Sequence, residues 1–361
     1  MKFGTDGWRA IIAEDFTFAN VRYCTQGVAD YAKRAGIASR GFVVGYDNRF
    51  ASEDFAAAAA EVLAGNGVRV LLSSRAAPTP VISYGVVHQG AAGAIVITAS
   101  HNPARWNGLK LRIADGSSAP AEVISEVEEH VSRAFDAGEV SRMPLDQAID
   151  RGLVSYHDLD VAYFERAARF VDLDRLKRAG LKIVVDPMYG VGAGYLGRLL
   201  DGGKLSLEEI NRERNPAFPG INPEPIAVNL EKLQATVRDR QADIGIAQDG
   251  DADRIGIVDE NGLFLTQLQV FALLCHYLLE VRGERGAIVK TITTTSMIDR
   301  LGEIYGVPVI ETPVGFRFVA PKITEENAII GGEESGGYGF RGHVPERDSI
   351  PAALYFLDFM V

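Results

Sequence analysis

The chain repeats one strand–turn–helix–strand pattern three times, and this repetition limits the possible folds more than any other feature. The three copies begin with apolar runs at residues 42–46, 181–186 and 287–290. In the first copy, Ser52 opens an alanine-rich stretch that predicts a helix ending at Gly65. Strands that alternate with helices form parallel sheets covered by those helices. The pattern therefore predicts an α/β protein with three similar mixed α/β domains.

The length and the segments between the copies predict where the domains end. At about 150 residues per domain, 361 residues suffice for two or three. A charged helix at 121–136 and a polar stretch after it separate the first copy from the second. A strand pair at 244–247 and 255–259, with a hairpin turn expected at 260–262, closes the second. The predicted domains are residues 1–152, 153–257 and 258–361.

The composition excludes several classes of protein. Lys and Arg number 37 against 48 Asp and Glu, so the net charge is −11, and such a chain repels the phosphates of nucleic acids. The two cysteines, Cys24 and Cys275, stand far apart in apolar stretches, which indicates a reducing compartment and no disulfide framework. The longest apolar stretch, 270–281, is too short to span a bilayer. We therefore expect a cytoplasmic protein without nucleic-acid or membrane partners.

A serine motif follows the apolar run 93–97. The sequence Thr-Ala-Ser-His-Asn-Pro, residues 98–103, places Ser100 and His101 just beyond the end of a buried strand. Ligands of α/β proteins bind at this end of the strands, and the small residues before Ser100 leave its hydroxyl accessible. The alternative is a structural turn in which Ser and Asn cap the local backbone and His101 lies on the surface.

An acidic motif follows the run 244–248. Asp249, Asp251 and Asp253 alternate with Gly and Ala, so the backbone can curl and bring three carboxylates to one hard divalent cation. A calcium EF-hand loop is the nearest lookalike, but Arg254 stands where that loop needs Gly, and strands rather than helices are expected on both sides. A purely structural turn remains a further alternative.

A glycine-rich motif, residues 331–337, forms the third candidate. Its glycines, Gly332 among them, allow the backbone close to a ligand, while Glu333 and Ser335 present an acceptor and a donor on the same face. Such a pair suits adjacent sugar hydroxyls, although a glycine-rich hairpin would look the same. Two further fragments, FGTDGWR with Arg9 and NGLK with Lys110, each supply a cation that could serve a phosphate or be solvated.

In order and spacing, these motifs resemble the α-D-phosphohexomutases, the family of phosphoglucomutases and phosphomannomutases. The matching fragments are FGTDGWR from Phe3, TASHNP from Thr98, NGLK from Asn107, DGDADR from Asp249, VGFRF from Val314 and GEESGG from Gly332. The resemblance implies domains arranged around a central cleft. It also implies a fourth, C-terminal domain that grips the non-reacting phosphate; because this chain ends at Val361, we expect that domain to be absent.

The resemblance also implies roles for individual residues. Ser100 would carry a phosphoryl group and, with the three aspartates, bind one Mg²⁺ per chain. Arg9 would steady the phosphoserine, Lys110 would act as general acid or base, and His101 and Arg254 would complete the catalytic group, with Arg254 at the reacting phosphate. Residues assigned to the sugar are Gly332, Glu333, Ser335 and His343. His343 is included as the candidate for a second proton-handling group, because Gly337 stands where many relatives carry a histidine.

The implied reaction interconverts glucose 1-phosphate and glucose 6-phosphate through glucose 1,6-bisphosphate, which also serves as activator. The partners would be sugar phosphates, and a chain without the fourth domain would be a weak catalyst. A preference for mannose, or for both sugars, stays open. Two rival readings are an aspartyl-phosphate phosphatase with Asp249 as nucleophile and a non-catalytic fragment that binds sugar phosphates.

Overall fold

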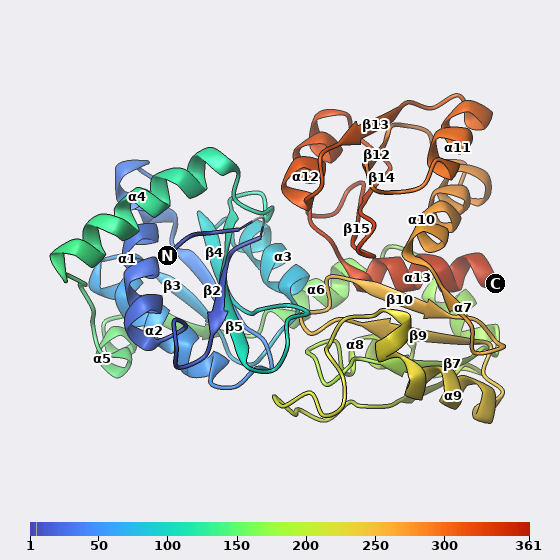
Figure 1. The fold of residues 1–361 in the computed structure, drawn as a ribbon, viewed down its shortest axis with the longest axis horizontal. Helices are drawn as coiled ribbons and strands as arrows, with labels where there is room; N and C mark the ends of the chain where they lie inside the picture. The colour runs from blue at the N-terminus through green and yellow to red at the C-terminus, as the bar shows by residue number, and fades with distance from the viewer. Residues whose placement is uncertain (5) are drawn as a thin grey trace. The chain divides into compact units, whose positions relative to one another are not determined.

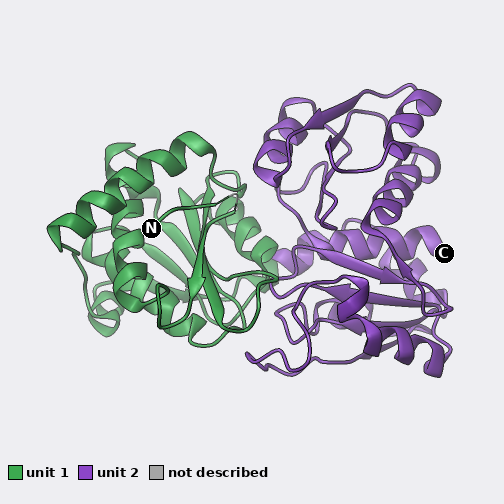
Figure 2. Ribbon diagram, in the orientation of Figure 1, with its two compact units in different colours: residues 1–162 green, residues 163–361 purple. Residues whose placement is uncertain are grey.

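The computed structural model describes residues 1–4 and 6–361; Thr5, within the FGTDGWR motif, lies outside the described residues. The described chain divides into two compact units, Met1–Ala162 and Tyr163–Val361 (Figure 2). Helix α6 (Asp160–Ala167) spans the border between them.

Unit 1 is built on a six-stranded mixed sheet with the strand order β1-β5-β4-β2-β3-β6. Its strands are β1 (Trp8–Ile11), β2 (Phe42–Tyr46), β3 (Val70–Ser73), β4 (Gly93–Ile97), β5 (Trp106–Ile113) and β6 (Val154–His157). Strands β4, β2, β3 and β6 run parallel to one another, whereas β5 is antiparallel to both β4 and β1. The carboxyl ends of β2 and β4 therefore lie at the same edge of the sheet, where ligands of α/β proteins bind.

The helices of unit 1 cover both faces of this sheet. They are α1 (Phe18–Arg34), α2 (Ser52–Gly65), α3 (Thr79–Gln89), α4 (Ala121–Ala137) and α5 (Leu145–Asp150), with a 3₁₀ turn at Ala38–Arg40. Figure 1 shows α1, α2 and α4 on one side of the sheet and α3 on the other. The predicted bounds of α2 are confirmed, but the Ser52 hydroxyl does not cap the helix; it donates to Asp47 Oδ1 at 2.8 Å.

Unit 2 contains two sheets. The first has the order β11-β10-β9-β7-β8 and consists of β7 (Lys182–Asp186), β8 (Ser206–Glu209), β9 (Ile244–Gln248), β10 (Ile255–Val258) and β11 (Phe264–Leu265). The second has the order β13-β12-β14-β15 and consists of β12 (Ile288–Thr291), β13 (Val309–Thr312), β14 (Ile330–Gly332) and β15 (Tyr338–Phe340). With the sheet of unit 1 there are three sheets, one for each of the three mixed α/β domains expected from the sequence.

Helix α13 joins the two sheets of unit 2. The helices of this unit are α7 (Leu173–Arg178), α8 (Tyr195–Leu200), α9 (Glu231–Arg240), α10 (Gln267–His276), α11 (Met297–Tyr305), α12 (Phe316–Glu325) and α13 (Ser349–Met360), with a 3₁₀ turn at Ala227–Asn229 and a π turn at Tyr277–Val281. Helix α13 packs against β10 of the first sheet and β15 of the second (Figure 1). Because its residues are buried over most of its length, it serves as core for both sheets.

The sheets cross the expected domain borders at two places. Strand β6 pairs with β3, so the first sheet continues past residue 152, and β11 pairs with β10, so the second continues past residue 257. The expected turn at 260–262 joins β10 to β11 and not β9 to β10. The acidic motif itself connects β9 to β10. The small residues between its carboxylates permit this tight reversal of the chain.

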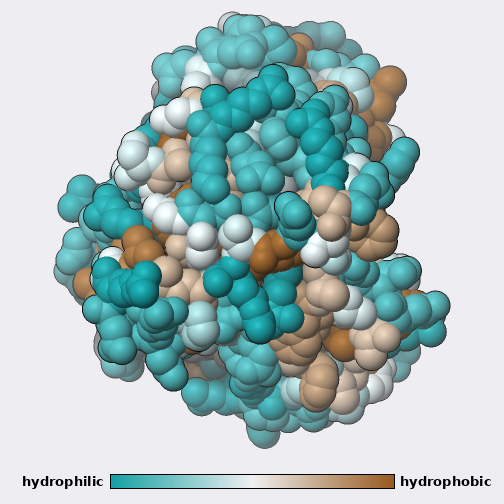
Figure 3. Space-filling model, turned by 90° about the vertical axis from the view of Figure 1, so that its left-hand side faces the viewer, coloured by the Kyte–Doolittle hydropathy of each residue, from teal (hydrophilic) through white to brown (hydrophobic). Residues whose placement is uncertain are grey.

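The core and the surface agree with the composition. Cys24 and Cys275 are free and fully buried, as expected, and burial raises the pKa of both thiols. The face drawn in Figure 3 is mostly hydrophilic, with apolar residues scattered over it. Within the described part of the chain, none of the helices has the length and apolarity needed to traverse a membrane.

Candidate active site

The serine loop of unit 1 has an unusual backbone conformation. Ser100 follows β4 with φ at +53°, in the left-handed region that residues with a side chain rarely adopt. Its amide donates to Thr98 Oγ1 at 2.8 Å, and its hydroxyl lies 3.4 Å from Nδ1 of His101. A left-handed residue other than glycine costs about 1 to 3 kcal/mol, so the surrounding structure must hold it in place.

Arg49 supplies that support from beneath the loop. It donates hydrogen bonds to the carbonyl oxygens of Ser100, Asn102, Pro103 and Trp106 at 2.6, 2.5, 3.0 and 3.0 Å. The guanidinium is fully buried and lies 3.3 Å from Asp47, which also accepts from Thr98 at 2.6 Å. Burial raises the pKa of Asp47, and Arg49 opposes this shift. Sequence reasoning missed both residues, although they directly follow β2 at the same sheet edge.

The two predicted cations of unit 1, Arg9 and Lys110, lie on strands that form one sheet with β4, the strand before the serine loop. Arg9 on β1 donates to Asn102 Oδ1 at 2.6 Å, which ties it to the loop. Lys110 on β5 is buried and lies 2.8 Å from a carboxylate oxygen of Asp6. Asp6 also pairs with Arg112 at 2.8 Å. Asp6 thus lies between two cationic side chains, those of Lys110 and Arg112. Asp6 lies inside the FGTDGWR motif, but the sequence does not predict its contacts with Lys110 and Arg112.

The acidic motif of unit 2 forms a closed loop between β9 and β10. One carboxylate oxygen of Asp249 accepts the amides of Asp253 at 2.9 Å and Arg254 at 3.0 Å, and Ala252 takes a left-handed φ of +57° to complete the turn. The expectation that strands, not EF-hand helices, flank this loop is confirmed. The loop geometry is therefore fixed by its own backbone contacts.

The three carboxylates of this loop fit a divalent cation. Asp249, Asp251 and Asp253 are buried, and each offers an oxygen within 4.8 Å of the others. Burial raises the pKa of Asp249 well above its ordinary value, and the nearby Asp253 and Asp251 raise it further. Three negative groups at this spacing repel one another, and a bound cation would offset that repulsion. All-oxygen ligation of this kind suits Mg²⁺ or Ca²⁺.

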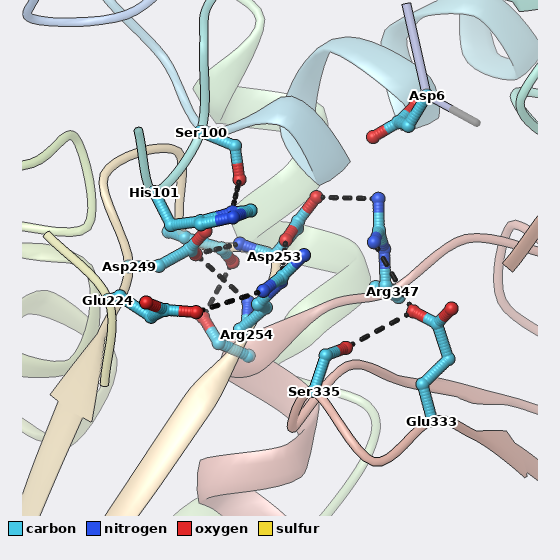
Figure 4. A network of polar contacts seen from close by, with 12 residues as sticks. Asp6, Ser100, His101, Glu224, Asp249, Asp253, Arg254, Glu333, Ser335 and Arg347 are labelled. Carbon is cyan, nitrogen blue, oxygen red and sulfur yellow. Dashed lines mark hydrogen bonds and ion pairs between the residues drawn. The ribbon is translucent and has the colours of Figure 1, made fainter. Parts of the chain in front are cut away.

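Arg254 ends the acidic loop. Its guanidinium lies 3.8 Å from Glu224 and 3.8 Å from Asp253, and its side chain remains 12% exposed. Figure 4 shows Arg254 beside Glu224 and Asp253. The guanidinium is thus held beside the metal-ligand candidates while part of it stays open to a ligand. This arrangement is compatible with the predicted contact to a phosphate.

The glycine-rich loop lies between β14 and β15. Ser335 donates to Glu333 Oε2 at 3.3 Å, and the carbonyl of Gly336 accepts the amide of Ile255 at 2.9 Å, which fastens this loop to the end of the acidic one. Burial raises the pKa of Glu333, whereas Arg347 and Arg254 act in the opposite direction. Gly332 has a structural use here, because a Cβ at this position would lie 2.8 Å from the ring of Phe271.

Arg347 is a residue of unit 2 whose contacts sequence reasoning missed. Its guanidinium lies 3.0 Å from Asp253 and 3.3 Å from Glu333, and so bridges the acidic loop and the glycine-rich loop (Figure 4). In the sequence it stands between Glu346 and Asp348, which is typical of an exposed charged segment. No local pattern distinguishes it from a solvated arginine.

His343 needs a correction. Its side chain is fully buried, with Nε2 2.9 Å from Asp348, which also accepts from Tyr163 at 2.7 Å. The ring packs edge-on against Phe170. A buried histidine held in this way cannot contact a sugar, so we remove it from the candidate substrate residues.

The chain matches family models of known proteins over most of its length. The description "Phosphoglucomutase/phosphomannomutase, alpha/beta/alpha domain I" matches residues 1–137, that of domain II matches residues 161–262, and that of domain III matches residues 267–361. A phosphoglucomutase/phosphomannomutase from Thermococcus kodakarensis is 35% identical over 346 residues, which cover 96% of this chain and 74% of the relative. The chain belongs to this family.

Other members of the phosphoglucomutase/phosphomannomutase family differ in the sugar that their names give. A phosphoglucosamine mutase from Carboxydothermus hydrogenoformans is 31% identical, over 99% of this chain and 79% of its own. A crystal structure of a candidate phosphomannomutase from Thermus thermophilus superimposes with a TM-score of 0.91 at 36% identity, covering 100% of this chain and 80% of that one. Family membership thus establishes the phosphohexomutase class and leaves the sugar open.

The predicted site residues of this family member fall into two groups. Unit 1 brings Ser100, His101 and Arg9 together, with Lys110 beside Asp6. Unit 2 joins the three aspartates, Arg254, Glu333 and Ser335 through the contacts described above.

Proposed function

We propose that this chain is a phosphohexomutase that interconverts glucose 1-phosphate and glucose 6-phosphate through a phosphoserine at Ser100. The single observation that carries the proposal is the buried triad of Asp249, Asp251 and Asp253. Three buried carboxylates cost folding free energy unless a cation offsets them, and phosphoryl transfer uses a divalent cation for this purpose. The serine loop and family membership support the same conclusion.

The proposed metal is one Mg²⁺, held by the three aspartates and an oxygen of Ser100. When bound, it would polarise the phosphoryl oxygens and offset their charge. A phosphoserine carries nearly two negative charges at neutral pH, so cations beside it are needed. Arg9, fixed by Asn102, supplies one charge to the phosphoserine, and Arg254 supplies another to the reacting phosphate.

The proposed transfer takes place in two balanced steps. The sugar O6 hydroxyl attacks phosphorus and the bond from phosphorus to Ser100 Oγ breaks; the Asp6 and Lys110 pair takes up the O6 proton, and a proton returns to Ser100 Oγ, which leaves as a hydroxyl. The product is glucose 1,6-bisphosphate, which turns over in the site. In the second step, the Ser100 hydroxyl attacks the C1 phosphate, the bond from phosphorus to the C1 oxygen breaks, and the serine proton is passed to that oxygen, so that glucose 6-phosphate leaves with a C1 hydroxyl and the phosphoserine is restored. In this scheme Lys110 is the general acid or base, and Asp6, 2.8 Å away, holds it in place.

The sugar is assigned from the glycine-rich loop. Glu333 would accept and Ser335 would donate a hydrogen bond to adjacent hydroxyls, which fits glucose and mannose phosphates equally by chemistry. The GEESGG form of the loop resembles that of phosphoglucomutases more than that of aminosugar mutases, and so favours glucose. Relatives are named for glucose, mannose and glucosamine phosphates. The two free, buried cysteines fit a reducing compartment such as the cytoplasm.

A coupled assay tests the proposal. The chain is supplied with Mg²⁺, a trace of glucose 1,6-bisphosphate, and glucose, mannose or glucosamine 1-phosphate in parallel, and formation of the 6-phosphate is followed. We expect turnover of glucose 1-phosphate, its loss on adding EDTA, and its loss in Ser100→Ala. The matched control Ser132→Ala, at an exposed helix position, should retain turnover. Binding of sugar phosphates without turnover would instead favour a non-catalytic binding protein.

A further inference from the structure

Arg347 shares one guanidinium between the two loops of unit 2. Its Nη2 lies 3.0 Å from Asp253 Oδ2 and its Nη1 lies 3.3 Å from Glu333 Oε2, while Nε lies 3.3 Å from Glu346. The side chain is only 5% exposed. One cation therefore offsets the charge of a metal-ligand candidate and of a sugar-binding candidate at the same time.

The backbone around Arg347 is fixed to both loops. The Ser349 hydroxyl donates to the carbonyl of Ala252, inside the acidic loop, at 2.6 Å and accepts from Gln248 at 2.7 Å. The amide of Asp348 donates to the carbonyl of Tyr338, just after the glycine-rich loop, at 2.9 Å. The position of the guanidinium is thus set by the fold and does not depend on a flexible surface arm.

Gly337 leaves room for this arginine. A Cβ at position 337 would lie 2.2 Å from Cδ and 2.7 Å from Cγ of Arg347. These atoms belong to the inner part of the side chain, so they cannot yield without moving the guanidinium. Any side chain at 337 would therefore displace Arg347 from Asp253 and Glu333, which gives a physical reason for glycine at this place.

We propose that Arg347 is a positioning residue that couples metal binding to sugar binding. The sugar part of this inference rests on the proposed function. The positive charge beside Asp253 weakens the attraction of the triad for a cation, while the guanidinium fork, whose Nη1 contacts Glu333, holds that carboxylate and offsets its charge. Loss of Arg347 should therefore strengthen metal binding and weaken sugar-phosphate binding. A residue that merely stabilised the fold would, when lost, weaken both.

The test measures the two affinities separately in the full chain. Mn²⁺ is titrated without sugar, and glucose 1-phosphate is titrated at saturating Mn²⁺, for wild type, Arg347→Met and Arg347→Lys. In Arg347→Met we expect Mn²⁺ to bind about threefold to tenfold more tightly, and glucose 1-phosphate to bind at least about tenfold more weakly. Arg347→Lys keeps the charge but not the fork, so only the sugar affinity should fall. The control is Arg300→Met, at an exposed position.

A second variant keeps the proposal testable if Arg347→Met unfolds. Gly337→Ala should shift both affinities in the same directions as Arg347→Met, and should add little further change in the Arg347→Met background. A fall or no change in Mn²⁺ affinity in Arg347→Met and Gly337→Ala overturns the proposal. If wild type binds Mn²⁺ but no sugar phosphate, the proposed function fails while the Mn²⁺ measurement still decides the charge effect of Arg347.

Discussion

Each aspartate of the acidic loop lowers the stability of the metal-free chain and is a proposed ligand of the metal. Without a cation, the three carboxylates repel one another within 4.8 Å. We predict that Asp251→Asn raises the unfolding midpoint of the metal-free chain but removes most of the stabilisation that added Mg²⁺ gives. The measurement is thermal unfolding with EDTA and with Mg²⁺. Asp239→Asn, at an exposed helix position, is the control. A variant that gained as much from Mg²⁺ as wild type would show that the metal binds elsewhere.

Asp186, at the end of β7, makes the stability depend on pH. Burial raises its pKa from 3.8 to about 6, although Met188 and Asn211 donate hydrogen bonds to it. Because the folded pKa is the higher one, the folded chain binds more protons between these values, and the contribution of Asp186 falls as pH rises through about 6. The full loss is about 3 kcal/mol, since one pKa unit corresponds to about 1.4 kcal/mol.

Asp186→Asn should remove this part of the pH dependence. We predict that the loss of unfolding free energy between pH 4.5 and pH 7.5 becomes smaller by about 2 kcal/mol than in wild type. Urea unfolding at the two pH values measures it, and comparing the two slopes cancels any hydrogen bond that the amide loses at both. Asp136→Asn, which is exposed, should leave the slope unchanged. An unchanged slope in Asp186→Asn would contradict the assignment.

At the scale of residues, the sequence predicts what is adjacent in the chain and misses what the fold brings together. Ser100 and the aspartates could be proposed as site residues because the chemistry of each motif lies within a few residues. Arg347 could not, since it meets Asp253 and Glu333 only in the folded structure. His343 failed for the converse reason: its burial comes from Phe170, far away in sequence.

At the scale of elements, the conformation of the loop after β4 is held by a residue that follows another strand. Arg49, which follows β2, holds four carbonyls of the 100–106 segment and balances the buried Asp47. Removing it leaves that carboxylate unpaired, at a cost of about 3 to 5 kcal/mol. The left-handed Ser100 would also lose the contact that holds it.

We predict that Arg49→Ala lowers the free energy of unfolding by this amount. Arg49→Lys should lose less stability, because the charge opposite Asp47 remains, but it should lower kcat about tenfold or more, because lysine cannot hold several carbonyls. Urea unfolding and the coupled assay measure the two effects. Arg133→Ala, an exposed arginine paired with Glu129, should change stability by less than about 0.5 kcal/mol. Wild-type kcat in Arg49→Lys would show that the loop needs no such support.

Elements with strong periodicity were predicted well. The strands β2 and β4 and the helix α2 have the expected bounds, because apolar runs and glycine stops mark them in the sequence. The turn between β9 and β10 was misplaced because the hairpin signal at 260–262 is a better local turn than the acidic motif. The acidic motif takes the turn instead, held by its own contacts to Asp249.

At the scale of the whole molecule, each unit has its own core and its own part of the chemistry. We predict that residues 163–361, expressed alone, fold and bind Mn²⁺ through the three aspartates, since all three and the contacts of their loop lie in this unit. Affinity should be lower than in the full chain, because Ser100 is missing. Asp251→Asn in the same fragment is the control. A folded fragment that bound no Mn²⁺ would show that the triad needs unit 1.

Two strands, β6 and β11, pair across the domain borders that the sequence predicts. Short strands such as β6 and β11 join a sheet by pairing with a distant strand, so no local signal places them in one domain or the next. The number of sheets, by contrast, followed from the repeated pattern.

The location of the phosphoryl group tests the central claim most directly. The full chain is incubated with glucose 1,6-bisphosphate and Mg²⁺, digested, and its peptides are weighed. A transferred phosphoryl group adds about 80 Da to the peptide that carries it. We predict this gain on the peptide that contains Ser100, resistance of the product to hydroxylamine, and no gain in Ser100→Ala. Phosphate on Asp249, removed by hydroxylamine, would contradict the account.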